Sequence, residues 1–597
     1  MRIEEFKKMM GSDRIPSYWD RRYVKNVEKL SKPINEVIHD KDVWMTLRDG
    51  TRLCVDIFRP DAEGKYPGLL SWSAYGKTIQ SIKRGSQPPE SLVFDQSLEA
   101  GDIDFFVRRG YVFVIPDPRG IGKSEGEFYG IYNPQEQEDV YDVIEWLAVQ
   151  SWCTGDIGMI GYSYFGIIQP LVAAQQPPHL KCIMPLSYTG DYYQHGHYGG
   201  VENTYMSMYW ELCPANNPKS WSMKIYPKEK VREMMEERAK DPDIALNSYF
   251  IKILTTWPPN YHTFYLDYLL HPLEGPFWAQ RSVQHMYGKI KVPVFLNCAF
   301  SPSGRWVTPV MQAWNSKELN VPKRVNLEDY SELELPYRSM NEECLRWYDH
   351  WLKGIDTGIM EEPPIKLNIL GSGYRYEYEW PLARTQWKKL YLRSFNRLSW
   401  EKDAESGLAP DSFVHNPPNV SSEINTLTYT SGPLTRPMEF TGPIALYLYA
   451  SIDATDANFI VKVYDLYPNG DRFYMPCWGA LRASHSLMES ESKPWLPVHD
   501  HSRTEPVVPG EIREYVIEVN PSSRVFQPGH SIQLVISAVD PSPLHKYSWS
   551  GKVMNMGPIP SAKSICYRIY RDAKYQSHLL MPYIPDTPAE QWVQSIG

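Results

Sequence analysis

The chain lacks the features that would direct it to a membrane or a secretory pathway. Its N-terminus, MRIEEFKKMMGSDRIPSYWD, has no apolar stretch of the signal-peptide kind, and no run approaches the roughly 20 apolar residues of a membrane span. Its 8 cysteines are scattered without a C-x-x-C pair, which is typical of free thiols in a reducing compartment. We therefore predict a cytoplasmic protein without a membrane partner.

A block of basic charge is also missing. Lys and Arg (62) are outnumbered by Asp and Glu (71), and the net charge is -9, so nothing matches the clusters that neutralise phosphates. We expect no nucleic-acid partner. The glycine-rich stretch "DPRGIGKSEG" does not have the spacing of a dinucleotide or phosphate loop, and no cluster of metal ligands occurs. We predict no cofactor and no bound metal.

What is present is enough sequence for several folded units. At 597 residues the chain is too long for one compact core and suits two or three domains. Its composition, with 42% hydrophobic and 22% charged residues, is ordinary for a globular protein. We predict four parts: a helical arm over 1–37, an α/β domain over 38–187 and 289–360, a helical cap over 188–288, and a β-rich domain over 361–597.

Alternating strand and helix patterns predict a doubly wound, mostly parallel sheet in the α/β domain. The Asp49-Gly50 pair between alternating runs indicates a hairpin, and "PGLLSWSAYG", "YVFVIPDPRG" and "DIGMIGYS" are typical of buried strands. Residues 133–148 read as a helix, with Asn133 as N-cap and Pro134 in the first position. Strands and helices in this order imply parallel strands.

After Pro363-Pro364 the sequence pattern changes to β-branched and aromatic runs separated by turn residues. Examples are "IALYLYASIDA", "FIVKVYDLYPNGDRFYM" and "HSIQLVISAVD". Short strands at this spacing favour a β-sandwich of the jelly-roll kind.

The sharpest local signal is "IGMIGYSYFG", in which a buried strand runs through Ser163 into an apolar helix. A tight strand-to-helix turn needs small residues around the nucleophile, and it raises the serine hydroxyl to the helix N-terminus, where backbone N–H groups can hold an oxyanion. Gly161 fits this pattern, whereas Gly166 comes one position later than in G-x-S-x-G. The alternative is a serine that caps a core helix.

The motifs of the chain, in order, resemble those of the cocaine-esterase and X-prolyl dipeptidyl-peptidase group of α/β-hydrolases, over roughly residues 40 to 580. They are "WMTLRDGTRLCVDIFRP", "AYGK", "DPRGIGKSEGEF", "GYSYFG", "WYDHWLKGIDTGIMEEPPIKLNILG" and "WGALRASH". The resemblance implies an α/β-hydrolase domain, a helical cap, a C-terminal jelly roll and a Ser-Asp-His triad acting on esters, amides or N-terminal dipeptides. It implies that Ser163 is the nucleophile and that Tyr75 and the Tyr164 backbone N–H hold the oxyanion.

The other two members of the family's triad have no match in this chain. The family's acid follows the strand "VPVFLN", but here the segment from Cys298 to Gly304 contains no carboxylate. The family's histidine follows "KRVNL", but here the segment from Glu328 to Leu335 contains no histidine. A serine hydroxyl is a weak nucleophile without a base, and the base needs a group to orient it.

Two explanations stay open. The base could come from the cap, where His195 and His197 lie in "DYYQHGHYGG", with Glu328 or Asp329 as a relocated acid at the edge of the sheet. Ordinary cap histidines and a solvated loop carboxylate are the alternatives. The fold could instead have kept its oxyanion donors and abandoned covalent hydrolysis, as a lyase or cyclase of specialised metabolism, or as a catalytically silent binding protein.

We therefore predict a serine esterase-like α/β-hydrolase with an atypical catalytic triad, acting on a small organic ester, amide or related carbonyl compound. An aromatic cap segment suits an apolar or aromatic substrate, although the same side chains could join the cap to the sheet. Its aromatic residues are Tyr188, Tyr192, Tyr193, Tyr198, Tyr205, Tyr209 and Trp210. The expected partner is this small molecule, and the sequence leaves a homodimer open.

Overall fold

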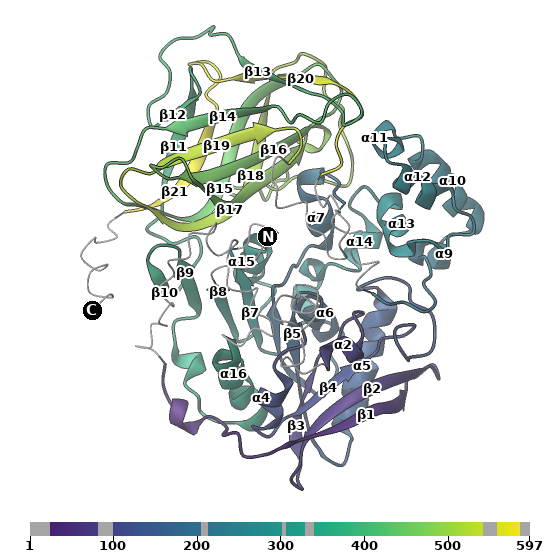
Figure 1. Cartoon of the computed structure of the whole chain (residues 1–597). Coiled ribbons are helices and arrows are strands. Elements are labelled where there is room, and N and C mark those ends of the chain that lie inside the picture. Colours follow the sequence, from purple (N-terminus) through teal and green to yellow (C-terminus); the bar gives the residue numbers. More distant parts are fainter. Residues whose placement is uncertain are drawn as a thin grey trace.

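A computed structural model of the chain has an α/β domain and a β domain stacked on each other, with short helices beside them (Figure 1). The structure describes residues 24–81, 99–204, 213–300, 306–328, 340–540 and 558–585, with the side chains of 473–476 left out. The helical arm predicted over residues 1–37 lies largely outside these ranges and stays a prediction. Its described part contains one short 3-10 helix, η2 (Val27–Lys29).

The first sheet has ten strands in the order β1-β2-β4-β3-β5-β6-β7-β8-β9-β10. Each pair from β4 to β9 in this order is parallel, while β1, β2 and β10 are antiparallel to their neighbours at the two edges. The strands are β1 (Val37–Thr46), β2 (Arg52–Pro60), β3 (Tyr66–Leu70), β4 (Val112–Pro116), β5 (Cys153–Tyr162), β6 (Leu180–Leu186), β7 (Val294–Ala299), β8 (Lys323–Glu328), β9 (Ile365–Ile369) and β10 (Gly373–Glu377). The doubly wound, mostly parallel sheet is confirmed.

Helices between these strands cover the sheet, and α5 (Pro134–Ala148) shows why they form. The Asn133 side chain accepts a hydrogen bond from the Glu136 N–H at 3.1 Å, as expected of an N-cap, and the helix buries its apolar face, including Val140 and Leu147. The other helices are α2 (Lys77–Gln80), α4 (Ile103–Val107), α6 (Tyr164–Ala173), α15 (Val307–Asn315), α16 (Asn341–Lys353) and the 3-10 helix η9 (Ile359–Glu361).

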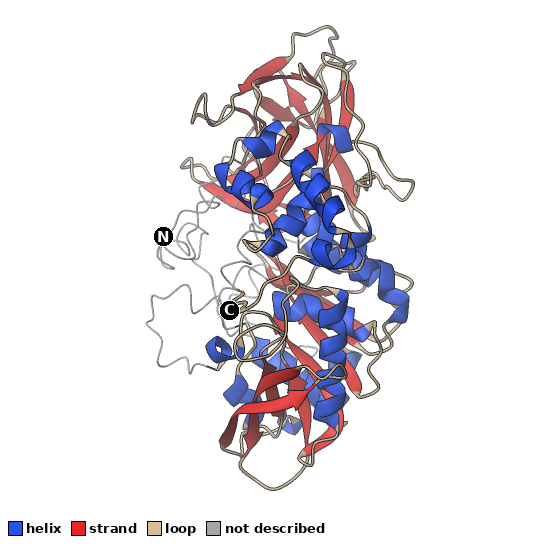
Figure 2. Ribbon diagram, turned by 90° about the vertical axis from the view of Figure 1, so that its right-hand side faces the viewer, coloured by secondary structure: helices blue, strands red, loops and turns tan. Residues whose placement is uncertain are grey.

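The segment between β6 and β7 forms the helical cap. Figures 1 and 2 show these helices at the level where the two strand-rich parts of the molecule meet. They are α7 (Tyr192–Gly196), η4 (Tyr198–Gly200), α9 (Trp221–Ile225), α10 (Lys228–Arg238), α11 (Pro242–Ala245), α12 (Ser248–Thr255), α13 (Thr263–Leu270), α14 (Pro276–Ala279) and η6 (Val283–Lys289). Buried cap side chains such as Tyr265 and Trp278 share one apolar core with the first sheet, so the cap is packed onto the α/β domain.

The C-terminal part forms an eleven-stranded second sheet in the order β13-β20-β15-β18-β17-β16-β19-β14-β12-β11-β21. Because β21 also pairs with β15, the sheet closes on itself around a separate apolar core. Its strands are β11 (Gln386–Arg393), β12 (Arg397–Ser399), β13 (Asp411–His415), β14 (Thr426–Ser431), β15 (Met438–Ile452), β16 (Asn458–Leu466), β17 (Arg472–Arg482), β18 (Arg513–Phe526), β19 (Ser531–Ser537), β20 (Ile565–Tyr570) and β21 (His578–Ile584), with the 3-10 helix η10 (Ala483–His485). The predicted β-sandwich is confirmed, and its jelly-roll connectivity stays a prediction. The first sheet continues to β10, past the boundary predicted at residue 361.

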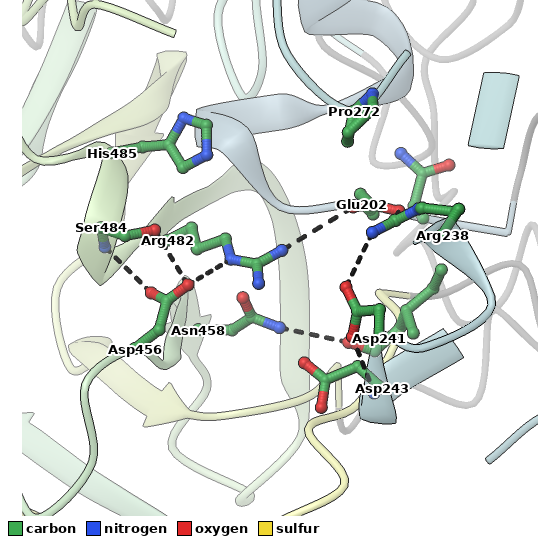
Figure 3. Close-up of polar contacts among 12 residues, drawn as sticks. Glu202, Arg238, Asp241, Asp243, Pro272, Asp456, Asn458, Arg482, Ser484 and His485 are labelled. Carbon is green, nitrogen blue, oxygen red and sulfur yellow. Dashed lines mark hydrogen bonds and ion pairs between the residues drawn. The ribbon is translucent and has the colours of Figure 1, made fainter. Parts of the chain in front are cut away.

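A network of charged side chains joins the cap to the β domain (Figure 3). From the end of β17, Arg482 contacts Asp456 at 2.6 Å and approaches Glu202 at 3.8 Å. From α10, Arg238 also pairs with Glu202 and contacts Asp241 at 2.7 Å. Removal of one side chain from this network would leave its partner's charge without compensation. These ion pairs therefore hold the cap in a fixed position against the β domain.

The described residues contain no membrane-spanning helix, no disulfide and no cluster of metal ligands. In the described ranges, no helix is both long and apolar enough to cross a bilayer. All eight cysteines are free, and seven of them are buried. No group of three or more His, Cys, Asp or Glu side chains within those same ranges could hold a metal ion.

Candidate active site

Ser163 occupies a sharp turn between β5 and α6. Its φ of 59° and ψ of -114° are rarely adopted by residues other than glycine, and such strained positions concentrate at functional sites. The Ser163 backbone holds the turn together, because its N–H donates to the Leu186 carbonyl at 2.9 Å and its carbonyl accepts from Ile167 at 2.8 Å. The side chain makes no capping hydrogen bond and is partly exposed, so Ser163 is not a simple helix cap.

The two glycines of the motif are required by close contacts. A Cβ atom added at Gly161, which has a φ of 136°, would lie 2.2 Å from the Phe165 Cβ. A Cβ added at Gly166 would lie 2.2 Å from the Leu186 carbonyl oxygen, because α6 passes directly over the end of β6. The later position of the second glycine therefore follows from the contact between helix and strand.

Replacing Gly166 with alanine is expected to lower the free energy of unfolding by about 3 kcal/mol, because the backbone of β6 must move to admit the methyl group. Urea unfolding monitored by circular dichroism measures this change. Gly288→Ala is the control, because its added methyl group would meet only Glu318 at an ordinary 3.9 Å. Equal stability of the Gly166→Ala variant and the wild type would contradict the close helix–strand contact.

Tyr75 lies beside the turn at Ser163 between β5 and α6, which we call the elbow, and it follows the end of β3. The residue is 3% exposed, and its ring packs edge-on against Tyr164 and Phe165, with centroid separations of 5.4 Å and 6.1 Å. Its backbone N–H donates to the Ser73 hydroxyl at 3.2 Å. The fold thus brings the tyrosine that the family resemblance assigns to the oxyanion site into contact with the residues that follow Ser163.

Glu99 also reaches the elbow, and the sequence analysis did not select it. The Ser163 hydroxyl and the Tyr164 backbone N–H lie close enough to its carboxyl group to lower its pKa. Burial raises the pKa of Glu99 well above its usual value, and these two polar groups oppose the shift. No sequence motif surrounds Glu99, so only the three-dimensional contact identifies it.

A second buried carboxyl group, Glu136, supports the elbow from behind. Its Oε1 accepts hydrogen bonds from the Tyr164 hydroxyl at 2.6 Å and from Trp72 Nε1 at 2.9 Å, and its Oε2 accepts the Tyr132 N–H. Burial nevertheless raises the pKa of Glu136 to about 7. Because Glu136 bonds the side chain of Tyr164 rather than Ser163, we assign it a structural role.

The pKa of Glu136 predicts a pH dependence of stability. Since the carboxyl titrates near 4.5 when unfolded and near 7 when folded, its contribution to the free energy of unfolding is full below pH 4.5 and is lost as the pH rises to about 7. Glu136→Gln should reduce this fall by about 3 kcal/mol, measured by urea unfolding across that range. Glu138→Gln, at an exposed position of α5, is the control. An unchanged pH profile for Glu136→Gln would contradict the assignment.

Comparison with known proteins gives the family. Residues 49–318 match the model of the X-Pro dipeptidyl-peptidase (S15 family), and residues 357–580 match that of the X-Pro dipeptidyl-peptidase C-terminal non-catalytic domain. The chain belongs to the cocaine esterase and X-Pro dipeptidyl-peptidase group. It is accordingly a serine hydrolase-like enzyme with the α/β-hydrolase fold.

Individual relatives cover nearly the whole chain. A cocaine esterase from Rhodococcus sp. is 25% identical, over 91% of this chain and 98% of that protein. A putative Xaa-Pro dipeptidyl-peptidase from Bacillus cereus is 22% identical, over 86% of this chain and 88% of that protein. The crystal structure of a CocE/NonD family hydrolase from Staphylococcus aureus superposes with a TM-score of 0.71 at 22% identity, over 94% of this chain and 98% of that one, which supports the fold.

The cap histidines offered as a replacement for the family's base lie in aromatic surroundings. The His195 ring lies near Tyr192 and Trp306, with centroids 5.5 Å and 5.0 Å away, and burial lowers the pKa of His195 to about 4. The His197 ring is stacked between Tyr193 and Tyr268, at centroid distances of 4.7 Å and 4.5 Å.

Among the described residues, no hydrogen bond connects these two histidines to Ser163, and both ring nitrogens of His197 are buried without a partner there. Burial lowers the pKa of His197 well below its usual value, so the imidazole is neutral at physiological pH. A role for either histidine as the base stays a prediction that this geometry does not support.

The loops that carry the acid and the histidine elsewhere in the family follow β7 and β8. Residues 301–305 and 329–339 are not among those described, so the prediction of Asp329 as a relocated acid lies outside the described residues. The Glu328 carboxyl, at the end of β8, accepts hydrogen bonds from Asn326 and from the Tyr374 hydroxyl. Glu328 therefore connects β8 to β10 across the intervening strand β9.

The aromatic cap segment mainly joins the cap to the α/β domain. Tyr188, Tyr192 and Tyr193 have no exposed surface, and the Tyr188 hydroxyl lies 2.7 Å from that of Tyr287 in η6. Tyr205, Tyr209 and Trp210 lie outside the described residues. Of the two uses predicted for these aromatics, packing is the one that the described members serve.

Proposed function

We propose that the chain hydrolyses a small organic ester or amide, with Ser163 as the attacking nucleophile. The single observation that carries this proposal is the strained turn at Ser163, a partly exposed residue at the N-terminus of α6 beside Tyr75. Acyl transfer needs a nucleophile and donors aimed at the developing oxyanion, and the Tyr75 hydroxyl and the Tyr164 N–H are the candidate donors.

The surroundings of Ser163 favour an apolar or aromatic acyl group. Tyr75, Tyr164 and Phe165 form an aromatic cluster next to the elbow. Relatives and fold neighbours include a cocaine esterase and an α-amino acid ester hydrolase, which supports ester substrates. The sequence contains no specific acidic anchor for a substrate amine, so we place dipeptidyl-peptidase activity below esterase activity. A cytoplasmic location and a homodimer remain sequence-based expectations.

A panel of chromogenic substrates tests the proposal. We expect the purified full-length chain to hydrolyse p-nitrophenyl acetate and p-nitrophenyl benzoate, with a burst of p-nitrophenol that reports acyl-enzyme formation. An alanyl-prolyl p-nitroanilide should be turned over much more slowly. If the chain hydrolysed neither of the two esters, the proposal would be overturned.

One observation favours a second candidate, a non-hydrolytic lyase or cyclase. The Tyr164 N–H, which would bind an oxyanion, lies near the Glu99 carboxyl, and burial favours the neutral acid form of that group. A neutral carboxylic acid can donate a proton to a substrate carbonyl without forming an acyl-enzyme. Loss of native turnover in a Glu99→Gln variant of a chain that does not hydrolyse esters would support this candidate.

A further inference from the structure

The backbone holds Glu99 in place at the elbow. Its carbonyl accepts the N–H of Tyr162, the last residue of β5, at 2.9 Å. The carbonyl of the next residue, Ala100, accepts the Ser71 hydroxyl at 3.3 Å, just after the end of β3. These contacts fix residues 99 and 100 against the carboxyl ends of two central strands, where active sites of such sheets form. The position of the carboxyl relative to Ser163 is therefore set by the scaffold.

The carboxyl group of Glu99 is buried and in contact with the reacting groups. Glu99 is 7% exposed, and its Oε2 has no hydrogen-bond partner among the residues that the structure describes. Among the described residues, the groups that lower its pKa are the Ser163 hydroxyl and the Tyr164 N–H, and no charged side chain contributes to the shift. A buried carboxyl that contacts a nucleophile has the environment of a catalytic acid or base.

We propose that Glu99 is the proton-transfer partner of Ser163 and takes the role that a histidine has elsewhere in the family. This inference rests on the proposed function. It needs no histidine from the cap and no carboxylate from the loops after β7 and β8. Ionised carboxylates serve as general bases when their position is fixed and their pKa is raised towards the working pH.

The proton and the electron pairs balance in each step. The Glu99 carboxylate takes the hydroxyl proton as Ser163 Oγ bonds to the substrate carbonyl carbon, whose π electron pair moves to oxygen. Collapse of this intermediate breaks the bond to the leaving group, which receives the proton from Glu99. Water then adds to the acyl carbon and gives its proton to Glu99, and the proton returns to Oγ as the acid departs. Only substrate and water are consumed.

The position of the Glu99 carboxyl near the Tyr164 N–H explains how the oxyanion donor becomes available. An N–H group bonds about twice as strongly to a charged acceptor as to a neutral one. When Glu99 takes the proton from Ser163 it becomes neutral, and its electrostatic attraction for the Tyr164 N–H weakens. The negative charge has at that moment moved to the substrate oxygen, so the N–H turns to the stronger acceptor.

The rate of hydrolysis should depend on pH because only the ionised form of Glu99 can accept the Ser163 proton. Since burial raises the pKa of Glu99 above its usual value, the active fraction increases as the pH rises through that raised pKa. Among the described residues, the titratable groups packed around the elbow include Tyr75, Tyr164 and, behind Tyr164, Glu136. Glu136 titrates at about 7 and is the group that could imitate this behaviour, so it must be tested in parallel.

The experiment measures kcat/KM of the full-length chain for p-nitrophenyl acetate from about pH 5 to about pH 9. The wild type should gain activity with rising pH. Glu99→Gln should lower kcat/KM by about 10²- to 10⁴-fold and remove this dependence. Glu136→Gln should keep the dependence, because its carboxyl does not contact Ser163. A Glu99→Gln variant with the rate and the pH profile of the wild type would overturn the inference.

Chemical rescue separates a proton-transfer role from a packing role. In Glu99→Ala, sodium formate should restore activity by at least about 10-fold, because a small carboxylate can replace the missing base. Formamide has the same size but cannot take the proton, and it should restore nothing. Equal rescue by formamide would show that Glu99 only fills space. Thermal unfolding checks that both variants fold, and the nearly isosteric glutamine variant keeps the test available if the alanine variant does not.

The two proposals fail in different ways. If Ser163→Ala is inactive on the ester while Glu99→Gln is fully active, Ser163 remains the nucleophile and only the role of Glu99 is overturned. If Ser163→Ala retains wild-type activity, or the wild type hydrolyses no ester, the proposed function fails and the role of Glu99 fails with it.

Discussion

Replacing Ser163 with alanine is expected to lower kcat/KM for p-nitrophenyl esters by at least about 10⁴-fold. The hydroxyl is the only atom removed, and the strained turn is held by backbone hydrogen bonds that alanine keeps. Without the nucleophile no acyl-enzyme forms, so the burst of p-nitrophenol should disappear together with steady-state turnover. Stopped-flow absorbance measures both quantities in one experiment.

Ser187→Ala is the matched control for this variant. Ser187 follows β6, the strand next to β5, and its buried hydroxyl has no hydrogen-bond partner in the described part of the chain. We expect its removal to leave the burst and the steady-state rate close to those of the wild type. A Ser163→Ala variant that retained the burst would exclude Ser163 as the nucleophile.

The second large effect is expected for Tyr75→Phe, which removes one oxyanion donor and keeps the aromatic ring. Loss of one such donor costs about 10²- to 10³-fold in kcat, because the hydrogen bond strengthens as charge develops on the substrate oxygen. KM should change little, since the ring contacts with Tyr164 and Phe165 are preserved. Separate determination of kcat and KM for an aryl ester tests this prediction.

Tyr188→Phe provides the comparison. The Tyr188 hydroxyl hydrogen bonds to Tyr287 within the cap and not at the elbow. Its loss should lower the melting temperature and leave kcat nearly unchanged. If Tyr75→Phe behaved in the same way, with reduced stability and normal kcat, Tyr75 would be a core tyrosine and the oxyanion assignment would be wrong.

The parts of the fold that the sequence predicts are those determined by local patterns. Helix α5 begins where Asn133 and Pro134 predict it, because capping depends only on adjacent residues. The turn at Ser163 is equally local, since it needs a strand, a small residue and an apolar helix in succession. Strand existence could be predicted in the same way, but the closure of the second sheet through β15 and β21 joins distant segments and leaves no local signal.

The same distinction explains what the sequence misses at the site. Gly166 is displaced from the common motif because of a contact with Leu186 on another strand, which no local pattern encodes. Glu99 lies in a segment without a motif, and glutamate is nearly always solvent-exposed, so only the return of the chain to the end of β5 reveals its contact with Ser163. The cap histidines stay a prediction based on their place in the cap, and the aromatic rings that stack on both faces of His197 come from separate segments that no local pattern connects.

The most direct test of the account is the intact mass of the protein after reaction with a fluorophosphonate, followed by peptide mapping. We predict one adduct per chain, located on Ser163 and absent from Ser163→Ala, because an activated serine at the elbow attacks phosphorus as it attacks a carbonyl. An unmodified wild-type chain, or an adduct on another residue, would contradict the claim that Ser163 is the nucleophile of this enzyme.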